Sequence, residues 1–408
     1  MHSEHYLYRK AEALKDQLFM WRRHFHQYPE RSFQEENTAA FVEKELRNIQ
    51  GMEVFAGKEE TGLKTGVAGI LRKGSGPTIA LRADMDALPI QEENKTSYRS
   101  VYDGIMHACG HDAHTAMLLG AARLLSEEET FQGTVKFIFQ PAEEMTDRKG
   151  KSGAPYMINH GMLEDVSMAF ALHMDPEYRP GTVRLHQGPS MANVDTFQAE
   201  IGGTGGHGAY PHLGTDPLWM LSFVIQAVQG ITSRKTSPLV PSVISIGEVK
   251  AGSSTNVIPD QVTIQGTIRS YDQDTRRHLE EELKQAFSVV EAMGGSYQLH
   301  VEKGEPALFN DETAVYMFDK TMQDIFPGFS IIREPYGLGG EDFGYMAEEV
   351  PAAMLFLGAG FENNHQRGLH MPRFDLQEDI LPVGASLLAG TALQFFQHYV
   401  KHEEGSGK

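Results

Sequence analysis

The only cysteine of the 408-residue chain, Cys109, lies in a segment dense in groups that bind transition metals. Residues 107–114 (HACGHDAH) hold three histidines, an aspartate and this thiol. A single cysteine cannot form a disulfide within the chain, so its neighbours must account for it. Thiolate sulfur and imidazole nitrogen are ligands that zinc and similar ions prefer. The segment therefore indicates a metal site, with a buried cysteine near surface histidines as the alternative.

Three further segments place ligand-type residues where an apolar stretch ends. Glu143 and Glu144 follow a strand predicted over 134–139, and two adjacent carboxylates point in different directions, so they can take different roles. His173 and His370 also follow apolar stretches. Ligands bind in the crevice at the carboxyl ends of the strands of an open α/β sheet. We therefore expect these side chains to meet in one such crevice.

These motifs give the chain a resemblance to the M20 metallopeptidase family, in its aminoacylase, hippurate-hydrolase and auxin-conjugate-hydrolase branch. The likeness begins at residues 21–30 (WRRHFHQYPE) and extends to about Ala385. It implies an N-acyl-amino-acid amidohydrolase, which cleaves a linear amide bond with metal-activated water and holds two divalent ions per subunit. Manganese or zinc is expected in that site, with cobalt or nickel as alternatives.

The resemblance also implies roles for single residues. Glu143 matches the general base that takes a proton from water and passes it to the leaving amine. Asp86 matches an aspartate that orients a ligand histidine, and His114 is expected to support the ligands or to pack against them. Asp84 stands where related branches carry a ligand histidine and is a weak candidate. The implied metal ligands are Cys109, His111, Glu144, His173 and His370, with Cys109 as the bridge between two ions.

A glycine-rich loop at 202–212 follows a predicted strand but lacks the GxGxxG spacing of a dinucleotide site. By resemblance, its His207 helps to stabilise the tetrahedral oxyanion, often from the partner subunit of a dimer. Asn256 and Arg269 match substrate-binding motifs, and the arginine fork suits the carboxylate of an amino acid. Glu341 matches a motif near the cleft and is expected to support the site.

The sequence departs from the family pattern directly after Glu144. The family usually has a short glycine-rich turn there, whereas this chain carries the longer charged segment 145–152 (MTDRKGKS), which can alter substrate access. A dipeptidase or carboxypeptidase on the same scaffold therefore remains an alternative. The residues are also compatible with a thiol hydrolase, with Cys109 as nucleophile and His111 or His114 as base, and with a binding protein without catalytic activity.

The elements that must position these residues suggest two domains. Strand-like and helical segments alternate from 67 to 172, which predicts an α/β catalytic domain with a mostly parallel sheet and helices on both faces. Over 190–301 the order β-α-β-β-α-β is that of a ferredoxin-like α+β domain. We therefore expect a catalytic domain built from 1–189 and 302–408, with a small lid or dimerisation domain inserted at 190–301.

Composition limits the range of partners. Lys and Arg number 36 against 55 Asp and Glu, a net charge of −19, which disfavours nonspecific binding to nucleic acid or to anionic membranes. The N-terminus has no apolar core of signal-peptide length, and no segment is expected to approach the ~20 apolar residues of a membrane span. With one cysteine, these features predict a cytoplasmic protein. The expected partners are a small N-acyl amino acid and further copies of the chain, in a dimer or tetramer.

Overall fold

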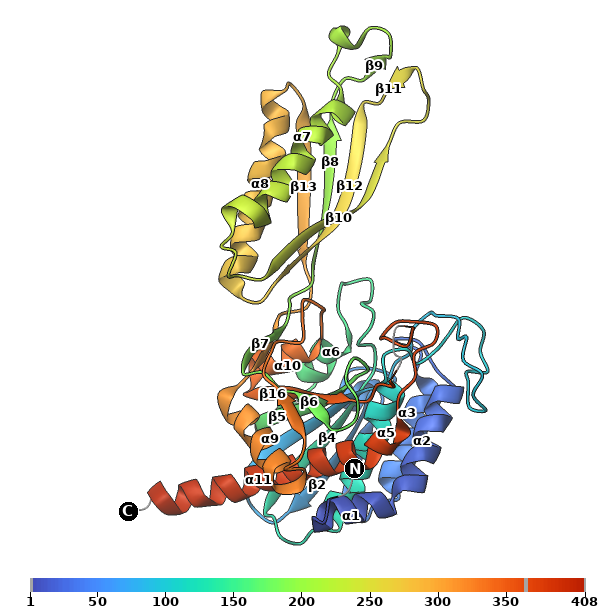
Figure 1. The fold of residues 1–408 in the computed structure, drawn as a ribbon, viewed down its shortest axis with the longest axis vertical. Coiled ribbons are helices and arrows are strands. Elements are labelled where there is room, and N and C mark those ends of the chain that lie inside the picture. Colours follow the sequence, from blue (N-terminus) through green and yellow to red (C-terminus); the bar gives the residue numbers. More distant parts are fainter. Residues whose placement is uncertain (1–2, 363–365, 407–408) are drawn as a thin grey trace. The chain divides into compact units, whose positions relative to one another are not determined.

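The computed structural model describes residues 3–362 and 366–406, which fall into two units (Figure 1). The catalytic unit comprises the chain up to Gly188, residues Phe309–Tyr336 and the chain from Asp342 onward. The small unit comprises Pro189–Leu308 and Gly337–Glu341. It therefore contains the segment expected as the inserted domain and adds a short strip from further along the chain.

An eight-stranded sheet forms the centre of the catalytic unit. Its strands are β1 (Met52–Ala56), β2 (Val67–Lys73), β3 (Thr78–Asp84), β4 (Gly133–Gln140), β5 (Val166–Asp175), β6 (Thr182–Arg184), β15 (Ser330–Ile332) and β16 (Ala352–Gly358). Their order across the sheet is β1-β2-β4-β3-β5-β16-β6-β15. The central strands β4, β3, β5 and β16 are mutually parallel, and the antiparallel pairs β1–β2, β2–β4 and β6–β16 lie to either side. The predicted mostly parallel sheet is confirmed.

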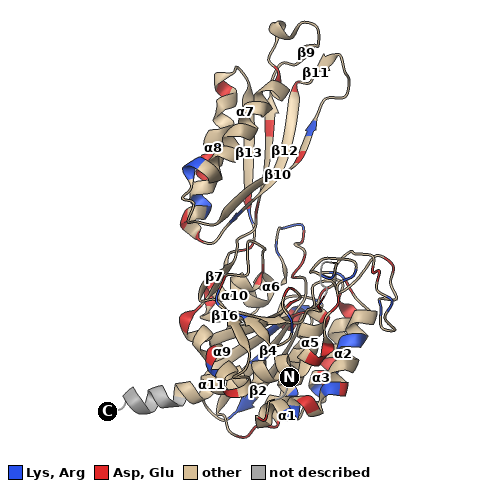
Figure 2. Ribbon diagram, in the orientation of Figure 1, with Lys and Arg blue, Asp and Glu red and all other residues tan. Residues whose placement is uncertain are grey.

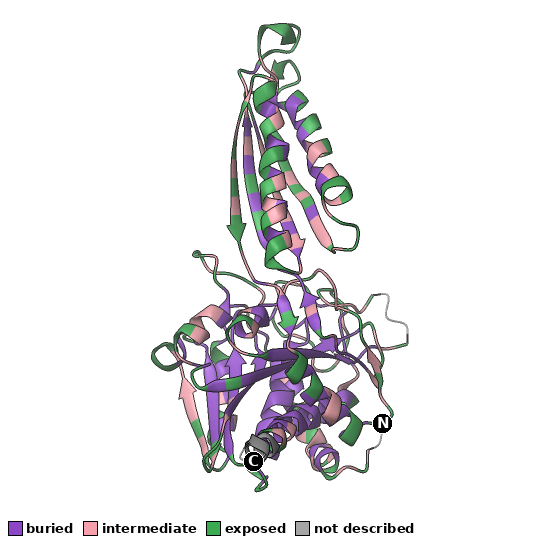
Figure 3. Cartoon of the chain, turned by 90° about the vertical axis from the view of Figure 1, so that its left-hand side faces the viewer, coloured by how far each residue is buried: buried purple, intermediate pink, exposed green. Residues whose placement is uncertain are grey.

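Helices cover both faces of this sheet, as predicted. One hydrophobic core joins a sheet face to α1 (Tyr6–Ala13), α2 (Lys15–Gln27), α3 (Glu36–Arg47), α5 (His111–Ser126), α9 (Glu312–Ile325) and α11 (Leu381–Ser406). Because side chains alternate along a strand, Arg82 and Gln140 point to the other face. There they bind Asp342, beside α6 (Gly153–Asn159) and α10 (Phe343–Glu349). Figure 3 shows the buried residues concentrated in the strands and helices of this unit.

One segment contradicts the expectation about apolar stretches. Residues Glu378–Tyr399 form a helical stretch of 22 residues with a mean hydropathy of 1.3, which is long and apolar enough to cross a membrane. Within the described chain it is the one helix that meets this test, and 89% of the apolar window is buried inside the protein. That degree of burial is typical of a core helix, and α11 contributes Leu387 and Leu388 to the core described above.

The small unit has the predicted order of elements. Its main elements are β8 (Asp195–Gly202), α7 (Pro217–Gly230), β10 (Ser242–Ala251), β12 (Gln261–Ser270), α8 (Gln273–Ala292) and β13 (Ser296–Lys303). The strands form an antiparallel sheet in the order β10-β12-β8-β13, and both helices share a core with one face of it. A separate pair, β9 (Gly206–His207) and β11 (Val257–Ile258), lies beyond one end of β8 and β12 (Figure 1).

Short elements complete the chain. They are α4 (Lys58–Thr61), β7 (Gly188–Met191), η1 (Pro211–Leu213), η2 (Ile231–Lys235), β14 (Leu308–Asn310) and η3 (Glu378–Ile380). Acidic and basic side chains are interspersed along the helices and loops of both units (Figure 2).

Candidate metal centre

The predicted ligands are positioned by the carboxyl ends of β4 and β5, which flank β3 in the sheet, and by the start of α5. Glu144 follows β4, His173 lies near the end of β5, and His111 is the first residue of α5. Gly110 has a left-handed backbone (φ 94°), which turns the chain sharply between Cys109 and the helix. Parallel strands end at the same edge of a sheet, so these residues converge as the sequence predicted.

Cys109 lies at the centre of the converging side chains. Its Sγ is 3.6 Å from His173 Nε2 and 3.3 Å from His370 Nε2, and the same His370 nitrogen is 3.3 Å from Glu144 Oε1. Two of the candidate donor sets, each gathered within 4.8 Å, contain this cysteine. One set is Cys109, His111 and His173, and the other is Cys109, Glu144 and His370. We call these five residues the ligand cluster; its two halves share the cysteine.

One atom of the ligand cluster indicates what it can bind. His111 Nε2 is buried and has no hydrogen-bond partner among the described residues. Leaving such an atom unsatisfied costs about 1–3 kcal/mol. The other nitrogen of His111, Nδ1, lies 2.9 Å from the carbonyl oxygen of Asp86 and 3.2 Å from its Oδ1. A histidine held at one nitrogen with the other free is the usual arrangement of a metal ligand, so a divalent cation fits these donors.

His173 shows the same arrangement, whereas His114 does not. His173 Nδ1 donates to the Met174 carbonyl at 2.8 Å, which leaves Nε2 facing Cys109. His114 Nδ1 lies 2.6 Å from Asp84 Oδ1, and its Nε2 accepts the Met174 N–H at 2.9 Å. Asp84 also accepts a hydrogen bond from Arg82 at its other oxygen. These bonds occupy both ring nitrogens of His114 and both oxygens of Asp84, so the geometry favours a supporting role for these two residues.

The electrostatics of the cluster favour a cation. Burial raises the pKa of the Cys109 thiol far above its usual value, and Glu144, Glu143 and Asp84 raise it further. Burial would lower the pKa of His111, but Asp84, Asp86 and Glu144 outweigh it and raise the pKa to about 10. A metal ion would supply the positive charge that these acids favour and would deprotonate the thiol. A thiol with a raised pKa is a poor nucleophile, which disfavours the thiol-hydrolase alternative.

Glu143 lies beside the ligand cluster without belonging to either half. Its Oε2 is 3.9 Å from His111 Nε2, and its side chain is 11% exposed. The carboxylate is therefore close enough to the candidate ligands to exchange a proton with a molecule held there, and it retains access to solvent. This is the geometry expected of a general base.

The remaining predicted residues lie in the small unit, at its two ends. His207 pairs with Val257 in the β9–β11 ladder, and Gly208 N–H donates to the Asn256 carbonyl, so His207 and Asn256 are neighbours. Arg269 lies at the other end of β12, and its Nη1 donates to the Asp195 carbonyl at 3.3 Å. The separation along the strands is roughly 25 Å at about 3.3 Å per residue, too far for one small substrate to span. Glu341 is buried within the strip Gly337–Glu341.

The family model described as peptidase family M20/M25/M40 matches residues 80–394. The chain belongs to this family. N-acetyl-L-cysteine deacetylase of Bacillus subtilis (strain 168) is 40% identical over 372 residues, which are 90% of this chain and 85% of that protein. Thermostable carboxypeptidase 1 of Saccharolobus solfataricus is 36% identical over 393 residues, covering 94% and 97%.

A solved structure also places the chain in this peptidase family. A dinuclear metal-binding peptidase of the M20 family from Bacillus subtilis has a TM-score of 0.82 and 33% identity, covering 95% of this chain and 99% of that one. The resemblance drawn from the motifs is therefore confirmed. As a member of this peptidase family, the protein is a hydrolase of amide bonds.

Sequence reasoning missed several residues that hold the M20 site in place. Ser32 donates to Asp86 Oδ2 at 2.6 Å, and the buried Glu35 accepts a hydrogen bond from the Ala142 N–H at 2.8 Å. Glu35 has an exposed acidic neighbour, Glu36, and the two look alike in the sequence. The only signal in the sequence for Ser32 and Glu35 was that they come directly after the N-terminal motif at 21–30.

The charged segment 145–152 has a defined shape in this family member. Asp147 Oδ1 accepts the N–H groups of Lys149 and Lys151 at 2.8 and 3.2 Å, and its Oδ2 accepts the Tyr156 hydroxyl at 2.6 Å. The segment is therefore folded back on one aspartate, and Arg148 and Lys149 are exposed on it. A structured, positively charged loop thus adjoins Glu144.

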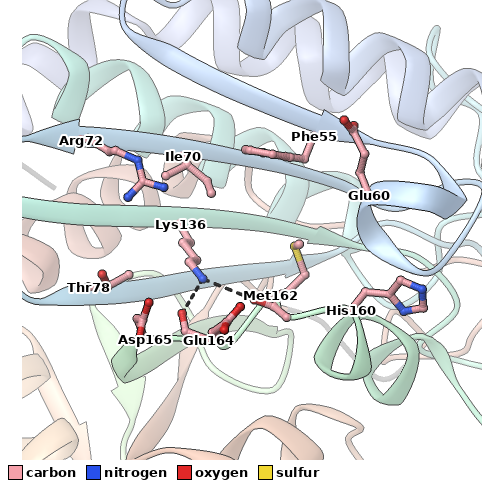
Figure 4. Close-up of a pocket in the computed structure, with 11 residues that line it drawn as sticks. Phe55, Glu60, Ile70, Arg72, Thr78, Lys136, His160, Met162, Glu164 and Asp165 are labelled. Atoms are coloured by element: carbon pink, nitrogen blue, oxygen red, sulfur yellow. Dashed lines mark hydrogen bonds between the residues drawn. The ribbon is translucent and has the colours of Figure 1, made fainter.

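A pocket of 420 Å³ lies away from the M20 site, against β1 to β4 (Figure 4). The close-up shows Arg72 and Lys136 facing Glu164 and Asp165 across it. Lys136 Nζ donates to the Glu164 carbonyl at 2.6 Å, so main-chain oxygen satisfies this cation. Its lining includes no residue of the ligand cluster.

A buried charged network lies behind the metal motif and makes stability dependent on pH. His26 Nδ1 is 2.8 Å from Asp112 Oδ2, and His26 Nε2 is 3.2 Å from Glu92 Oε1. Burial would lower the pKa of His26, but the hydrogen bonds to Asp112 and Glu92 raise it to about 9. Since this folded-state value exceeds the unfolded one of about 6.5, the contribution is complete below pH 6.5 and is lost as pH rises through 9.

We expect this contribution to be on the order of 3 kcal/mol. Urea unfolding of the wild-type protein and of His26→Gln at pH 6.5 and pH 9.5 measures it. The difference in unfolding free energy between the two proteins should shrink at the higher pH. A difference independent of pH would show that His26 is neutral throughout.

Proposed function

We propose that the protein is a dinuclear metal-dependent amidohydrolase that cleaves N-acyl amino acids into a carboxylate and an amino acid. The observation that carries the proposal is the pair of donor sets that share Cys109, with Glu143 beside them. The relative that removes the acetyl group from N-acetyl-L-cysteine supports an N-acyl substrate. The carboxypeptidase relative keeps a peptidase as the second candidate, on the same chemistry.

In this proposal the five residues of the ligand cluster would hold two divalent ions. Mixed sulfur, nitrogen and carboxylate donors suit zinc or manganese, with cobalt or nickel as alternatives. Such ions lower the pKa of water and polarise the substrate carbonyl. Glu143 accepts the proton of the attacking water and delivers it to the leaving nitrogen, and Asp86 keeps His111 oriented through its Nδ1.

The small unit contributes substrate contacts in this proposal. His207 donates a hydrogen bond to the oxyanion of the tetrahedral intermediate, and Arg269 pairs with the amino-acid carboxylate. Glu341 supports the site, and Asn256 acts beside His207. Because the Asn256 end and the Arg269 end of the small unit are too far apart to meet one substrate, two copies of the chain must contribute if both act.

We infer accordingly that the protein works as a homo-oligomer, with a dimer as the smallest unit. The outer face of α7 exposes Leu218, Trp219 and Phe223, at 44%, 55% and 41%. Adjacent exposed apolar side chains of this size favour contact with a second subunit. The charge of −19 and the mixed charges of both units argue against nucleic acid or membrane as partners, and a cytoplasmic location is consistent with the lone cysteine.

Amine release from a panel of N-acyl-L-amino acids and dipeptides tests the reaction, with added Mn²⁺ or Zn²⁺ and again with a chelator. Chelator-sensitive cleavage of the acyl compounds is expected. Cleavage of dipeptides alone would make the protein a peptidase. Cleavage that survives chelation would contradict the metal mechanism.

Replacement of His207 by Ala should lower kcat by about 10²–10³-fold with metal content unchanged, because one oxyanion donor is lost. Unchanged kinetics would make the loop merely structural. A mixing experiment then tests the role of the second copy. If His207 acts on the partner's site, His207→Ala and Glu143→Gln chains mixed and exchanged should regain about a quarter of wild-type activity, since half the dimers carry one intact site.

A further inference from the structure

The turn that aims Glu143 and Glu144 has an unusual backbone. Ala142, between β4 and the two carboxylates, has φ 54°, a left-handed conformation that a residue with a Cβ seldom adopts. Both of its main-chain polar groups are bound. Its N–H donates to Glu35 Oε1 at 2.8 Å, and its carbonyl accepts the Gly153 N–H at 2.7 Å. The unfavourable conformation therefore persists because neighbours on both sides hold it.

Glu35 is built into its position. It is fully buried, its Oε1 also accepts the Phe33 N–H at 3.0 Å, and the Thr65 hydroxyl donates to its Oε2 at 2.8 Å. Burial and the charge of Asp86 raise the pKa of Glu35 to about 8. Glutamine keeps an oxygen that can accept the same N–H bonds, so it is the closest substitute for Glu35.

On the side opposite Glu35, the main chain at Gly153 packs directly against the turn. A Cβ built on Gly153 would lie 1.8 Å from the Pro141 carbonyl oxygen, so the chain returning from the charged segment closes tightly onto the turn. Beyond the turn, the Glu144 N–H donates to Asp86 Oδ2 at 3.0 Å. Hydrogen bonds thus hold the main chain at Ala142 and at Glu144. Glu143 lies between these two residues, so a rotation of the main chain at Ala142 would redirect its side chain.

We propose that Glu35 is a positioning residue for the reaction, whose hydrogen bond to the Ala142 N–H sets the direction of Glu143 and Glu144. The proposal rests on the proposed function in which these two carboxylates serve as base and ligand. Glu35 itself is not one of the five donors of the ligand cluster. Its effect passes through one main-chain bond to the residue before the base.

The variants Glu35→Ala, Glu35→Asp and Glu35→Gln separate positioning from general stability. Alanine removes the bond, aspartate keeps an acid but withdraws it by one methylene, and glutamine retains the acceptor. Loss of a partner that orients a ligand lowers activity or metal affinity by about 10–100-fold. We expect that loss in kcat for the alanine and aspartate variants, with KM nearly unchanged, and less than about a threefold change for glutamine.

Thr65→Val is the matched control, because it removes the bond to Oε2 and leaves the bond to Ala142. This substitution should lower the melting temperature, because a buried hydrogen bond is lost, while kcat stays near the wild-type value. Folding of every variant is checked by circular dichroism. If glutamine is as damaging as alanine, or if aspartate in a folded protein keeps full kcat, the positioning role is overturned.

A readout without substrate keeps this test separate from the proposed function. Visible absorption of the Co²⁺-loaded protein and Zn²⁺ titration report the geometry and affinity of the Glu144 side of the cluster. We expect both to change in Glu35→Asp and to stay at wild type in Glu35→Gln. Should the protein bind metal yet cleave no acyl compound, the proposed function fails while these measurements still decide the role of Glu35. An unchanged spectrum and affinity in Glu35→Asp would overturn it.

Discussion

Glu143→Gln should reduce kcat by about 10²–10⁴-fold while leaving metal content unchanged. Glutamine has nearly the same shape as glutamate, but it cannot take up the proton of the attacking water at neutral pH. Glu143 lies 3.9 Å from His111 Nε2 and outside both donor sets that share Cys109, so its replacement leaves all five donors in place. The substrate should still bind, and KM should change little.

Steady-state amine release together with metal analysis of the purified protein checks this result. Glu164→Gln, in the pocket away from the ligand cluster, is the matched control and should behave as wild type. Retained turnover in Glu143→Gln would remove Glu143 as the base. Loss of metal in that variant would instead make the residue a ligand.

The second large effect is expected from Cys109→Ser. The thiol is the one donor common to both halves of the ligand cluster, and a serine hydroxyl is a far weaker ligand for these ions. We expect at least one of the two ions to be lost and kcat to fall by about 10²-fold or more. Serine nearly matches cysteine in volume, so the fold should persist.

Metal stoichiometry after gel filtration measures this effect. Wild-type protein treated with chelator gives the reference, and it should regain activity on addition of Mn²⁺ or Zn²⁺. Two ions bound at wild-type affinity in Cys109→Ser would contradict the role of Cys109 as a ligand shared by both halves of the cluster. The two variants differ in kind, because Glu143→Gln keeps metal without turnover and Cys109→Ser loses both.

The sequence predicted that Glu144 and His173 converge because both stand at strand ends, and the topology of a parallel sheet brings such ends together. His370 was also expected at a strand end, but it lies in a turn well after β16 and meets Cys109 from there. The sequence could not distinguish Glu35 from Glu36. Both are acidic residues at the start of a helix, and only the packing of Thr65 and Ala142 around one of them decides which is buried. Burial of this kind depends on segments far apart in the chain.

The same limitation applies to the small unit. Alternating hydrophobicity predicted its strands, and their order is the predicted one. The register, which pairs Gln261 with Gly202 and Ile268 with Asp195, was not predictable. Asn256 precedes β12 and Arg269 lies near its last residue, so the length of this strand puts them at opposite ends of the sheet, although both had been assigned to substrate binding.

The arrangement of the two units along the chain sets the order in which they can fold during synthesis. The small unit's sheet and helices are complete at Lys303, so it can fold while the remainder is still being synthesised. The catalytic unit must wait, because its core includes α11 and its ligand cluster includes His370, which are both synthesised after the small unit. A product that ends before His370 therefore lacks one donor of the ligand cluster and the core helix α11.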